Sequence, residues 1–325
     1  MINYGHMDSR FSSVTVRVPA SSANLGPGFD TLGMALTLYN TWTFRPSPDD
    51  DHHLTGFGEP LATRHVNDSL LLEAAQELAM QSGFGDLPPL SIDADIRIPV
   101  QRGMGSSASA VVGGLLGANT LFNFGASRDQ LLAIAYAMEG HADNAAAAIF
   151  GGIECVTTGR DNVGPLLFHR AVPVSPLLFE KLHIVAVVPS KRMGTDASRR
   201  VLPRSVSFDN AAFSINRLAL LMIAFVNGEP ELLRYGLADD LHQPYRWGEI
   251  KGLTEAIGVA VASGDYGACL SGSGSTILSF CPSAEVADRV GGAMRAALEA
   301  NGTPVDAVHV VRMDTGGATV QTEPI

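Results

Sequence analysis

The stretch RGMGSSASAVVGGLLGA, residues 102–118, places glycines and serines directly before an apolar run, and no further charged residue follows until Arg128. Glycine allows backbone conformations that turn successive N–H groups toward one point. A helix that begins immediately afterwards adds its own unpaired N–H groups and the positive end of its dipole. We therefore predict a helix over 105–122 whose start is either an anion-binding nest or an ordinary Gly-Ser turn with a serine cap. No GK[ST] follows, so the stretch is not a Walker phosphate loop, and alone it favours the turn.

Two other glycine-serine segments accompany this stretch: PASSANLGPGFDTLG (19–33) and LSGSGST (270–276). The first follows a predicted strand and holds five residues of special backbone or side-chain character within ten positions: Asn24, Gly26, Gly28, Asp30 and Gly33. A structural loop with Asx turns needs one or two such residues. The first segment therefore favours recognition of a polar substrate, whereas LSGSGST alone is more typical of a turn.

The segment MEGHADNAA, residues 138–146, gathers polar groups between two apolar helices. Glu139 carries a carboxylate, which is the hard ligand that Mg²⁺ prefers. Taken singly, Glu139 is more typical of a solvated surface acid, His141 of a structural residue and Asp143 of a helix cap. The functional interpretation of this segment depends on its occurrence in the same chain as the three glycine-serine segments.

Composition limits the classes of protein to consider. The chain has 325 residues, of which 46% are hydrophobic and 17% charged, so it can build a full core in one large or two ordinary domains. The formal net charge is −11, and we find no basic run longer than SRR at 198–200, which disfavours nucleic-acid and anionic-membrane partners. Three scattered cysteines indicate buried small hydrophobes. We see no membrane-span length or signal region, assign no function to the leader MINYGHM, and expect a soluble, cytoplasmic protein.

Periodicity predicts an α+β fold, because strands and helices do not alternate strictly. The predicted strands are 14–21, 31–44 (one or two strands), 90–99, 181–189, 275–280 and 306–313. The predicted helices are 67–83, 105–122, 127–140, 144–152, 195–202, 210–227, 230–241, 249–263 and 283–300. The polar stretch 159–180 is our linker candidate.

With these residues in place, the chain resembles the GHMP small-molecule kinases. PASSANLGPGFDTLG, PVQRGMGSSASA (99–110) and LSGSGST match the three signature motifs of that superfamily, in order and at similar spacing. Within it the chain is similar to the homoserine kinase branch, on the form of the first motif and on EGHADN, TDASRRVLP (195–203) and QPYR (243–246). The resemblance covers roughly residues 14–312.

The resemblance implies a two-domain GHMP kinase fold. Its N-terminal domain, 12–160 here, would contain a left-handed βαβ unit and the ATP-binding loop. Its C-terminal domain, 161–325, would be ferredoxin-like, and the active site would lie between the two. A homodimer is also expected from the resemblance.

The same resemblance implies the site residues and the cofactors ATP and Mg²⁺. The nucleotide-binding residues would be Asn67, Arg102, Gly103, Met104, Gly105, Ser106, Ser107 and Ala108. Ser107 and Glu139 would hold Mg²⁺. The substrate L-homoserine would be bound by Asn24, Asp30, His141, Asn144, Arg199, Arg246 and Gly272. Asp30 suits the amino group, and the two arginines can fork onto the carboxylate.

A catalytic base is the point where the branch departs from its superfamily. Many members use an aspartate, whereas the homoserine kinase branch has an asparagine at that place. HADN offers both Asp143 and Asn144, so the register stays open. A loose phosphoryl-transfer transition state depends mainly on positioning and charge neutralisation. We assign the catalytic roles to Asn144, Glu139 and Ser107, and leave Asp143 as a cap or a supporting group. Departures from the family are small: Met104 replaces leucine, Ser275 stands where proline is common, and the gap between Glu139 and Asn144 is the short form.

The predicted function is phosphorylation of the side-chain hydroxyl of L-homoserine to O-phospho-L-homoserine, a step of threonine biosynthesis. One alternative is another GHMP kinase, of the mevalonate or sugar type. Arg199 and Arg246 argue against it, because a neutral sugar has no carboxylate to pair. A second alternative is a non-catalytic nucleotide-binding protein on the same fold, against which the Ser107 and Glu139 pair argues. The net charge disfavours a third alternative, an RNA-binding module.

Overall fold

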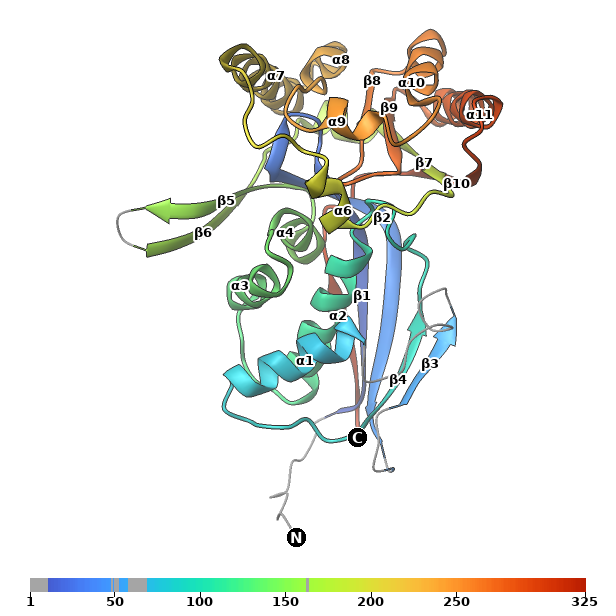
Figure 1. The fold of residues 1–325 in the computed structure, drawn as a ribbon. Helices are drawn as coiled ribbons and strands as arrows, with labels where there is room; N and C mark the ends of the chain where they lie inside the picture. The colour runs from blue at the N-terminus through green and yellow to red at the C-terminus, as the bar shows by residue number, and fades with distance from the viewer. Residues whose placement is uncertain (1–10, 48, 50–52, 58–68, 162–163) are drawn as a thin grey trace.

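The structure is a computed structural model that describes residues 11–47, 49, 53–57, 69–161 and 164–325. It has two halves, each built on a sheet with helices packed against it (Figure 1). The described N-terminus and the C-terminus lie together at the end of the lower half. Asn67, predicted to contact nucleotide, lies outside the described residues.

The lower sheet has seven strands in the order β11-β1-β2-β4-β3, with β5 pairing to β2 and β6 to β5. Its strands are β1 (Phe11–Asn24), β2 (Gly28–Pro46), β3 (His53–Phe57), β4 (Leu90–Asp95), β5 (Ile153–Asp161), β6 (Gly164–Ala171) and β11 (Thr319–Pro324). All pairs are antiparallel except β3 with β4. The parallel pair, with helix α1 between its strands in the sequence, forms the βαβ unit that the family resemblance implies; the hand of its crossover stays a prediction.

Four helices cover one side of this sheet: α1 (Leu70–Gln81), α2 (Ser106–Leu121), α3 (Arg128–Glu139) and α4 (Asp143–Phe150). Helix α2 is buried on nearly all sides, which explains why its sequence shows no polar face. Gly114 lets it approach α1 closely, because a Cβ there would lie 2.0 Å from the carbonyl oxygen of Leu71. Trp42 and Phe44 of β2 pack against the same helix. The apolar run that follows the glycines at 103 and 105 is therefore the central helix of the lower half.

The upper sheet has four antiparallel strands in the order β10-β7-β9-β8. They are β7 (His183–Pro189), β8 (Gly267–Leu270), β9 (Ile277–Cys281) and β10 (Val305–Val311). Numbered along the chain within this sheet, the spatial order is 4-1-3-2, which is the ferredoxin-like arrangement. The ferredoxin-like half expected from the family resemblance is confirmed.

Helices lie on both faces of the upper sheet. The longer ones are α7 (Phe208–Asn227), α10 (Leu253–Ala262) and α11 (Ala284–Ala300). Short ones connect them: α5 (Pro176–Lys181), α6 (Thr195–Arg200), η3 (Pro230–Leu232), α8 (Leu233–Gly236) and α9 (Gln243–Trp247). Along β7, Ile184 and Ala186 share a core cluster with Phe225 of α7, whereas Val185 and Val187 belong to the cluster of α10 and α11. Because β7 is buried on both faces, its sequence reads as a continuous apolar run rather than an alternating one.

The structure differs from the sequence-based predictions in several segments. The linker candidate 159–180 is wrong, because its described part holds the end of β5, strand β6 and helix α5. The single helix predicted over 230–241 is two short pieces, η3 and α8. The predicted domain boundary at 160 and 161 stays a prediction; in the structure these residues belong to strand β5, and β6 and β11 both pair into the lower sheet.

Helix α7 also departs from the sequence reading. By length and composition alone it is apolar enough to cross a membrane, whereas we had expected no such stretch. It carries Asp209 and Arg217 and buries Leu221 and Phe225 in the upper core. A single helix of this kind is weak evidence for a membrane span, and here it forms one layer of the upper half.

Candidate active site

A cavity of about 630 Å³ is lined by residues of both halves. Its walls come from the end of β1, the starts of α2 and α4, helices α6 and α9, and the loop before β9. The predicted site residues that line it are Asn24, Asp30, Arg102, Gly103, Gly105, Ser106, Ser107, Ala108, Glu139, His141, Asn144, Arg199, Arg246 and Gly272. The fold thus brings together residues that are up to 248 positions apart in the chain. Met104 does not line the cavity, since its side chain is buried in a core cluster.

One end of the cavity is formed by the glycine loop, residues 101–105, and the start of α2. Gly103 and Gly105 have φ values of +75° and +69°. A Cβ on Gly103 would lie 2.1 Å from the carbonyl oxygen of Ser271, so the third glycine-serine segment packs directly on this loop. The hydroxyl of Ser271 donates to the carbonyl oxygen of Gly103 at 2.6 Å, which fixes the two segments together.

The first turn of α2 presents unpaired donors. Its N-cap is Gly105, and no side chain of the described residues caps the helix. The serine-capped turn favoured for the stretch taken alone is therefore wrong. Among the described residues, no hydrogen bond uses the backbone N–H groups of Ser106, Ser107 or Ala108; the first such bond runs from Ser109 N to Gly105 O. Three free N–H groups at the positive end of a helix form an anion site.

Glu139, the last residue of α3, faces the same end of the cavity. Its Oε2 atom is buried and has no hydrogen-bond partner in the part of the chain that the structure describes. Burial raises the pKa of this carboxyl, which the hydrogen bond from Ser107 and the nearby His141 partly oppose. A buried, partly unsatisfied carboxylate next to a hydroxyl is a donor set that fits a hard divalent cation such as Mg²⁺. Among the described residues no three His, Cys, Asp or Glu side chains gather as a metal site, so such a cation would also need phosphate oxygens or water.

Asp143 and Asn144 begin helix α4 beside Glu139. The buried Asp143 carboxylate accepts a hydrogen bond from the backbone N of Asn144 at 2.7 Å and lies 3.3 Å from Nδ1 of His141. Burial lowers the pKa of His141, but Asp143 and Glu139 outweigh it and the net direction is upward. The amide oxygen of Asn144 accepts from Ser21 Oγ at 3.0 Å. Asp143 is thus engaged with its own helix start and with His141.

The opposite end of the cavity, which we call the arginine end, contains Asp30, Arg199 and Arg246. Arg199 binds Asp30 through two parallel hydrogen bonds of 3.0 and 2.7 Å. Asp30 raises the pKa of Arg199, so the guanidinium is charged. The ring of Phe29 lies 5.5 Å from the guanidinium carbon of Arg199 and 5.6 Å from that of Arg246, and helps to hold both in place.

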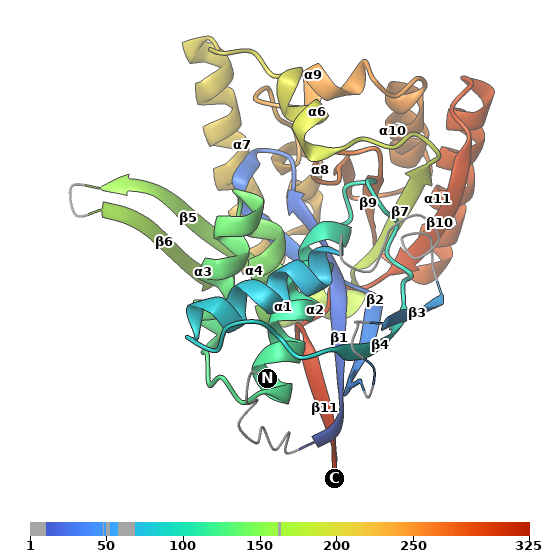
Figure 2. The same cartoon turned by 60° about the horizontal axis from the view of Figure 1, so that its bottom comes forward.

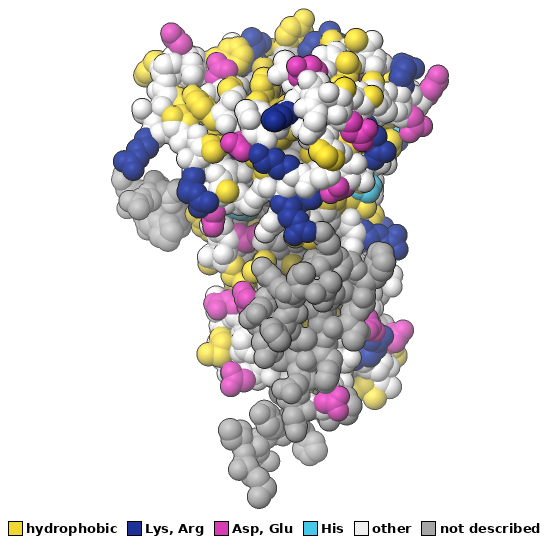
Figure 3. Space-filling model, turned by 45° about the vertical axis from the view of Figure 1, so that its right-hand side comes forward, with side chains coloured by type: hydrophobic (Ala, Val, Ile, Leu, Met, Phe, Trp, Pro, Cys, Tyr) yellow, Lys and Arg dark blue, Asp and Glu magenta, His cyan; other side chains and the backbone are white. Residues whose placement is uncertain are grey.

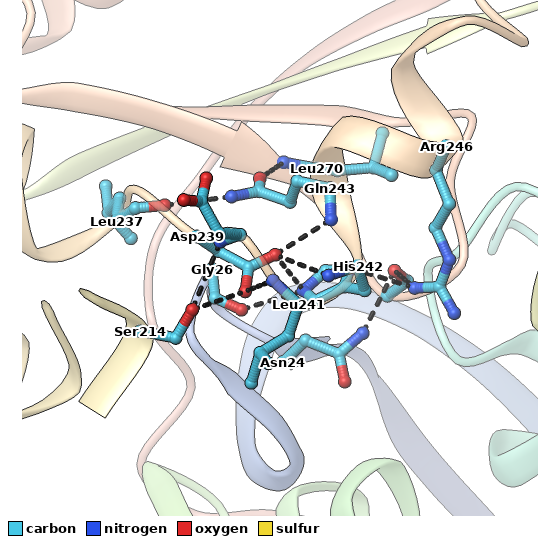
Figure 4. A network of polar contacts seen from close by, with 12 residues as sticks. Asn24, Gly26, Ser214, Leu237, Asp239, Leu241, His242, Gln243, Arg246 and Leu270 are labelled. Carbon is cyan, nitrogen blue, oxygen red and sulfur yellow. Dashed lines mark hydrogen bonds and ion pairs between the residues drawn. The ribbon is translucent and has the colours of Figure 1, made fainter. Parts of the chain in front are cut away.

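Asn24 connects this end to the third glycine-serine segment. Its side-chain NH₂ donates to Gly272 O at 3.0 Å, and its Oδ1 accepts from the backbone N of Asp30 at 3.1 Å. Arg246 donates to the same Gly272 oxygen at 3.0 Å (Figure 4). Burial and the neighbouring Arg199 lower the pKa of Arg246 to about 10, which still leaves it charged at neutral pH.

Arg102, predicted to contact nucleotide, is engaged elsewhere. Its guanidinium donates to three carbonyl oxygens, of Val100, Pro189 and Ser190, and to the carboxylate of Asp306. These contacts join the glycine loop to the upper sheet, so the side chain of Arg102 fixes the two halves relative to each other.

Sequence reasoning missed several residues around the site. Phe29 lies between two residues of the first motif, and only its position could have pointed to it. The more distant His242 contacts Arg246, and Asp239 accepts hydrogen bonds from the backbone of His242 and Gln243; this group is described below. In the sequence, Asp239 stands three residues before His242 and four before Gln243, which is a spacing typical of a helix cap. The side chains of His242 and Gln243, however, contact Gly26 and Leu270, which lie far away along the chain.

The chain matches two family models: "GHMP kinases N terminal domain" over residues 69–152 and "GHMP kinases C terminal" over residues 221–300. It is 39% identical over 308 residues to a homoserine kinase of Desulfitobacterium hafniense, covering 94% of this chain and 99% of that protein. It is 36% identical over 305 residues to a homoserine kinase of Moorella thermoacetica, with coverage of 94% and 99%. This chain belongs to the homoserine kinase family of the GHMP kinases.

Solved structures show the same fold for other members of the superfamily. A homoserine kinase from Cytophaga hutchinsonii superposes with a TM-score of 0.82 at 24% identity, over 99% of this chain and all of that one. A mevalonate kinase superposes with a TM-score of 0.67 at 14% identity, over 93% of this chain and 99% of that one. The two-domain GHMP kinase fold expected for this homoserine kinase family member is therefore confirmed.

Proposed function

We propose that this protein transfers the γ-phosphoryl group of ATP to the side-chain hydroxyl of L-homoserine and forms O-phospho-L-homoserine, a step of threonine biosynthesis. The observation that carries the proposal is one cavity with two chemically different ends. The glycine-loop end offers three free N–H groups and the carboxylate of Glu139, whereas the arginine end offers one carboxylate and two guanidinium groups. The first suits a triphosphate and the second a zwitterionic amino acid.

At the glycine-loop end, the phosphates of ATP would accept from the N–H groups of Ser106, Ser107 and Ala108. Glu139 and Ser107 would hold Mg²⁺, which neutralises charge on the phosphates when bound. Gly103 and Gly105 let the loop pack closely on Ser271 and Ser21, because a Cβ on either glycine would lie 2.1 Å from an oxygen of its neighbour. Asn67 is included in the proposal for the nucleotide side on the resemblance alone.

At the arginine end, Asp30 would bind the substrate ammonium, and Arg199 and Arg246 the carboxylate. Asp30 and Arg199 pair with each other in the structure, so a zwitterion can replace each partner with a group of the same charge. Asn24, His141, Asn144 and Gly272 complete the wall around the bound substrate.

Asn144 would orient the substrate hydroxyl, and no dedicated base is needed. The carboxylate of Asp143 already accepts a backbone hydrogen bond and lies beside His141. In a loose transition state the hydroxyl proton is lost late, so positioning and charge neutralisation lower most of the barrier.

The test is an ATP-consumption assay with L-homoserine, L-serine, mevalonate and galactose as separate acceptors. We expect turnover with L-homoserine well above the others. Turnover with mevalonate or galactose and none with L-homoserine would favour the alternative of another GHMP kinase. No turnover with any of the four, together with measurable ATP binding, would favour the non-catalytic alternative.

We further propose a cytoplasmic protein without nucleic-acid or membrane partners that forms a homodimer. In Figure 3, basic side chains lie among acidic ones over the upper half of the face shown, an arrangement that suits small-molecule rather than nucleic-acid binding. Light scattering on the purified protein tests the dimer, and the mass of a single chain would contradict it.

A further inference from the structure

Arg246 is held by a buried group whose members lie outside the cavity. The guanidinium receives support on one side from Gly272 O, as described above, and on the other from the ring of His242, whose Nδ1 lies 3.1 Å from Nη1. His242 has no exposed surface, and Arg246 is 2% exposed. Among the described residues, no hydrogen bond uses Nη2 of Arg246, so this is the nitrogen that remains for a ligand.

The partners of His242 determine where its proton lies. A guanidinium can only donate, so Nδ1 must accept from Arg246. On the far side of the ring, Nε2 lies 2.8 Å from the carbonyl oxygen of Gly26, which can only accept. The ring is therefore the neutral tautomer with its proton on Nε2. Burial and the adjacent Arg246 lower the pKa of His242 to about 4, in agreement with this assignment.

The backbone of His242 is fixed just as firmly. The buried carboxylate of Asp239 accepts hydrogen bonds from the backbone N atoms of Leu241, His242 and Gln243, at 2.7, 2.9 and 2.8 Å (Figure 4). The Gln243 side chain then joins the carbonyl oxygen of Leu237 to the backbone N of Leu270 on strand β8. The backbone that carries the imidazole of His242 is therefore held rigidly.

We propose that His242 is a positioning residue that orients Arg246 toward the carboxylate of the substrate and sets its distance from the first motif. Gly26 lies in the loop between β1 and β2, four positions before Asp30. The chain of contacts Gly26–His242–Arg246 therefore links the loop just before the ammonium-binding Asp30 to the carboxylate-binding guanidinium. This inference rests on the proposed assignment of Arg246 to the substrate carboxylate.

Two substitutions of His242 separate its two hydrogen bonds. The amide oxygen of asparagine lies as many bonds from Cβ as Nδ1 does, so His242→Asn keeps the acceptor for Arg246 and loses the donor to Gly26. The amide nitrogen of glutamine corresponds to Nε2, so His242→Gln keeps the donor and loses the acceptor. We expect His242→Gln to raise the KM for L-homoserine roughly 10- to 100-fold, as expected for a lost hydrogen bond to a charged group, with the KM for ATP changed by less than about threefold. His242→Asn should recover most of that loss.

Gln243→Met is the matched control for a merely structural role. Gln243 follows His242 as the first residue of α9, and its buried side chain makes two hydrogen bonds, neither of them to Arg246. We expect this variant to lower the Tm and to leave the KM for L-homoserine near its original value. Equal KM values for the Asn and Gln variants of His242, or a KM in His242→Gln no higher than in Gln243→Met, would overturn the proposal.

Arg246→Gln distinguishes the failure of this inference from the failure of the assignment on which it rests. If Arg246→Gln leaves the KM for L-homoserine unchanged, the assignment of Arg246 to the carboxylate is wrong, and the inference fails with it. If Arg246→Gln raises that KM and His242→Gln does not, only the positioning role is wrong. If the proposal is right, His242→Gln adds little to the KM in the Arg246→Gln background, because the two changes remove one shared interaction.

Discussion

At the glycine-loop end of the cavity, three backbone N–H groups and Oε2 of Glu139 have no partner among the described residues. At the arginine end, Asp30, Arg199 and Arg246 are each hydrogen-bonded to other protein groups. The first end is left unsatisfied and gains its partners only from a ligand. The second is organised in advance, and a ligand must exchange with the contacts between Asp30 and Arg199 that already exist. Changes at the first end should therefore affect turnover and the KM for ATP. Changes at the second end should affect the affinity for the amino acid.

The largest effect is expected from Glu139→Gln, which keeps the shape of the side chain and removes its charge. Loss of the anionic ligand should lower kcat by roughly 10³-fold with Mg²⁺ present, while the KM for L-homoserine stays within a few-fold. Steady-state kinetics in both substrates check this, with Glu77→Gln on the exposed face of α1 as the control. A near-normal kcat would remove Glu139 from the cation site and weaken the contrast between the two ends.

Gly103→Ala should have the next largest effect, because the loop cannot hold its shape with a Cβ 2.1 Å from a carbonyl oxygen of Ser271. We expect the KM for ATP to rise roughly 10- to 100-fold and the Tm to fall. Gly125→Ala is the matched control: Gly125 has a nearly equal φ of +74° and open space around its Cβ position. It should cost only the backbone strain of about 1–2 kcal/mol and leave the KM for ATP unchanged. Equal effects of the two variants would mean that strain, not the close approach, governs the loop.

Arg199→Lys tests the arginine end with a smaller change. Lysine keeps the charge but loses the planar fork that binds Asp30 through two hydrogen bonds. The KM for L-homoserine should rise roughly tenfold, and kcat and the KM for ATP should change little. Arg200→Lys, on the exposed face of the same helix, should behave like the unmodified protein. A larger effect on the KM for ATP than on the KM for L-homoserine would mean that Arg199 acts at the glycine-loop end instead of the arginine end.

The last prediction concerns the stability of the protein as a function of pH, and its expected effect on activity is the smallest. The pKa of His242 is about 4 in the folded protein against an ordinary 6.5, so the unfolded chain binds a proton that the folded chain does not. The stability that comes from this shift is lost as the pH falls from about 6.5 toward 4, by up to about 3 kcal/mol. Asp239, Arg246 and Asp30 are the charged groups that act on this ring. The free energy of unfolding, measured with denaturant, should differ less between pH 5 and pH 8 in His242→Asn than in the unmodified protein. An equal difference would contradict this source of acid sensitivity.

The sequence predicted most elements of this fold wherever periodicity reflected burial. The amphipathic helices were predicted because their buried residues recur at the helical period, and β7 because its buried residues form a continuous apolar run. Strand β11 was missed because five of its six residues are exposed and it shows no alternation. Strand β6 and the end of β5 were predicted as a linker, whereas they form a hairpin that projects from the body (Figure 1), where Phe168 is 46% exposed.

The site could be predicted only in part for a similar reason. The glycine-serine segments and Glu139 were found from residue types and spacing, and the two arginines only from the family resemblance. The role of Arg102 as a tie to the upper sheet was not visible, because its partners are carbonyl oxygens near position 190. His242 was missed because its partner Gly26 is 216 positions away, and no local pattern encodes such a contact.

The pairing of β11 with β1 links completion of the lower sheet to synthesis of the upper half. Strand β1 carries the first motif at one end and pairs with residues 319–324 at the other, and the strands of the upper sheet all precede those residues in the chain. A nascent chain that has released only its first half still has β1 at an open edge. The lower sheet is therefore complete only after the upper half has been synthesised, and we expect the two halves to fold together rather than one after the other as independent domains often do.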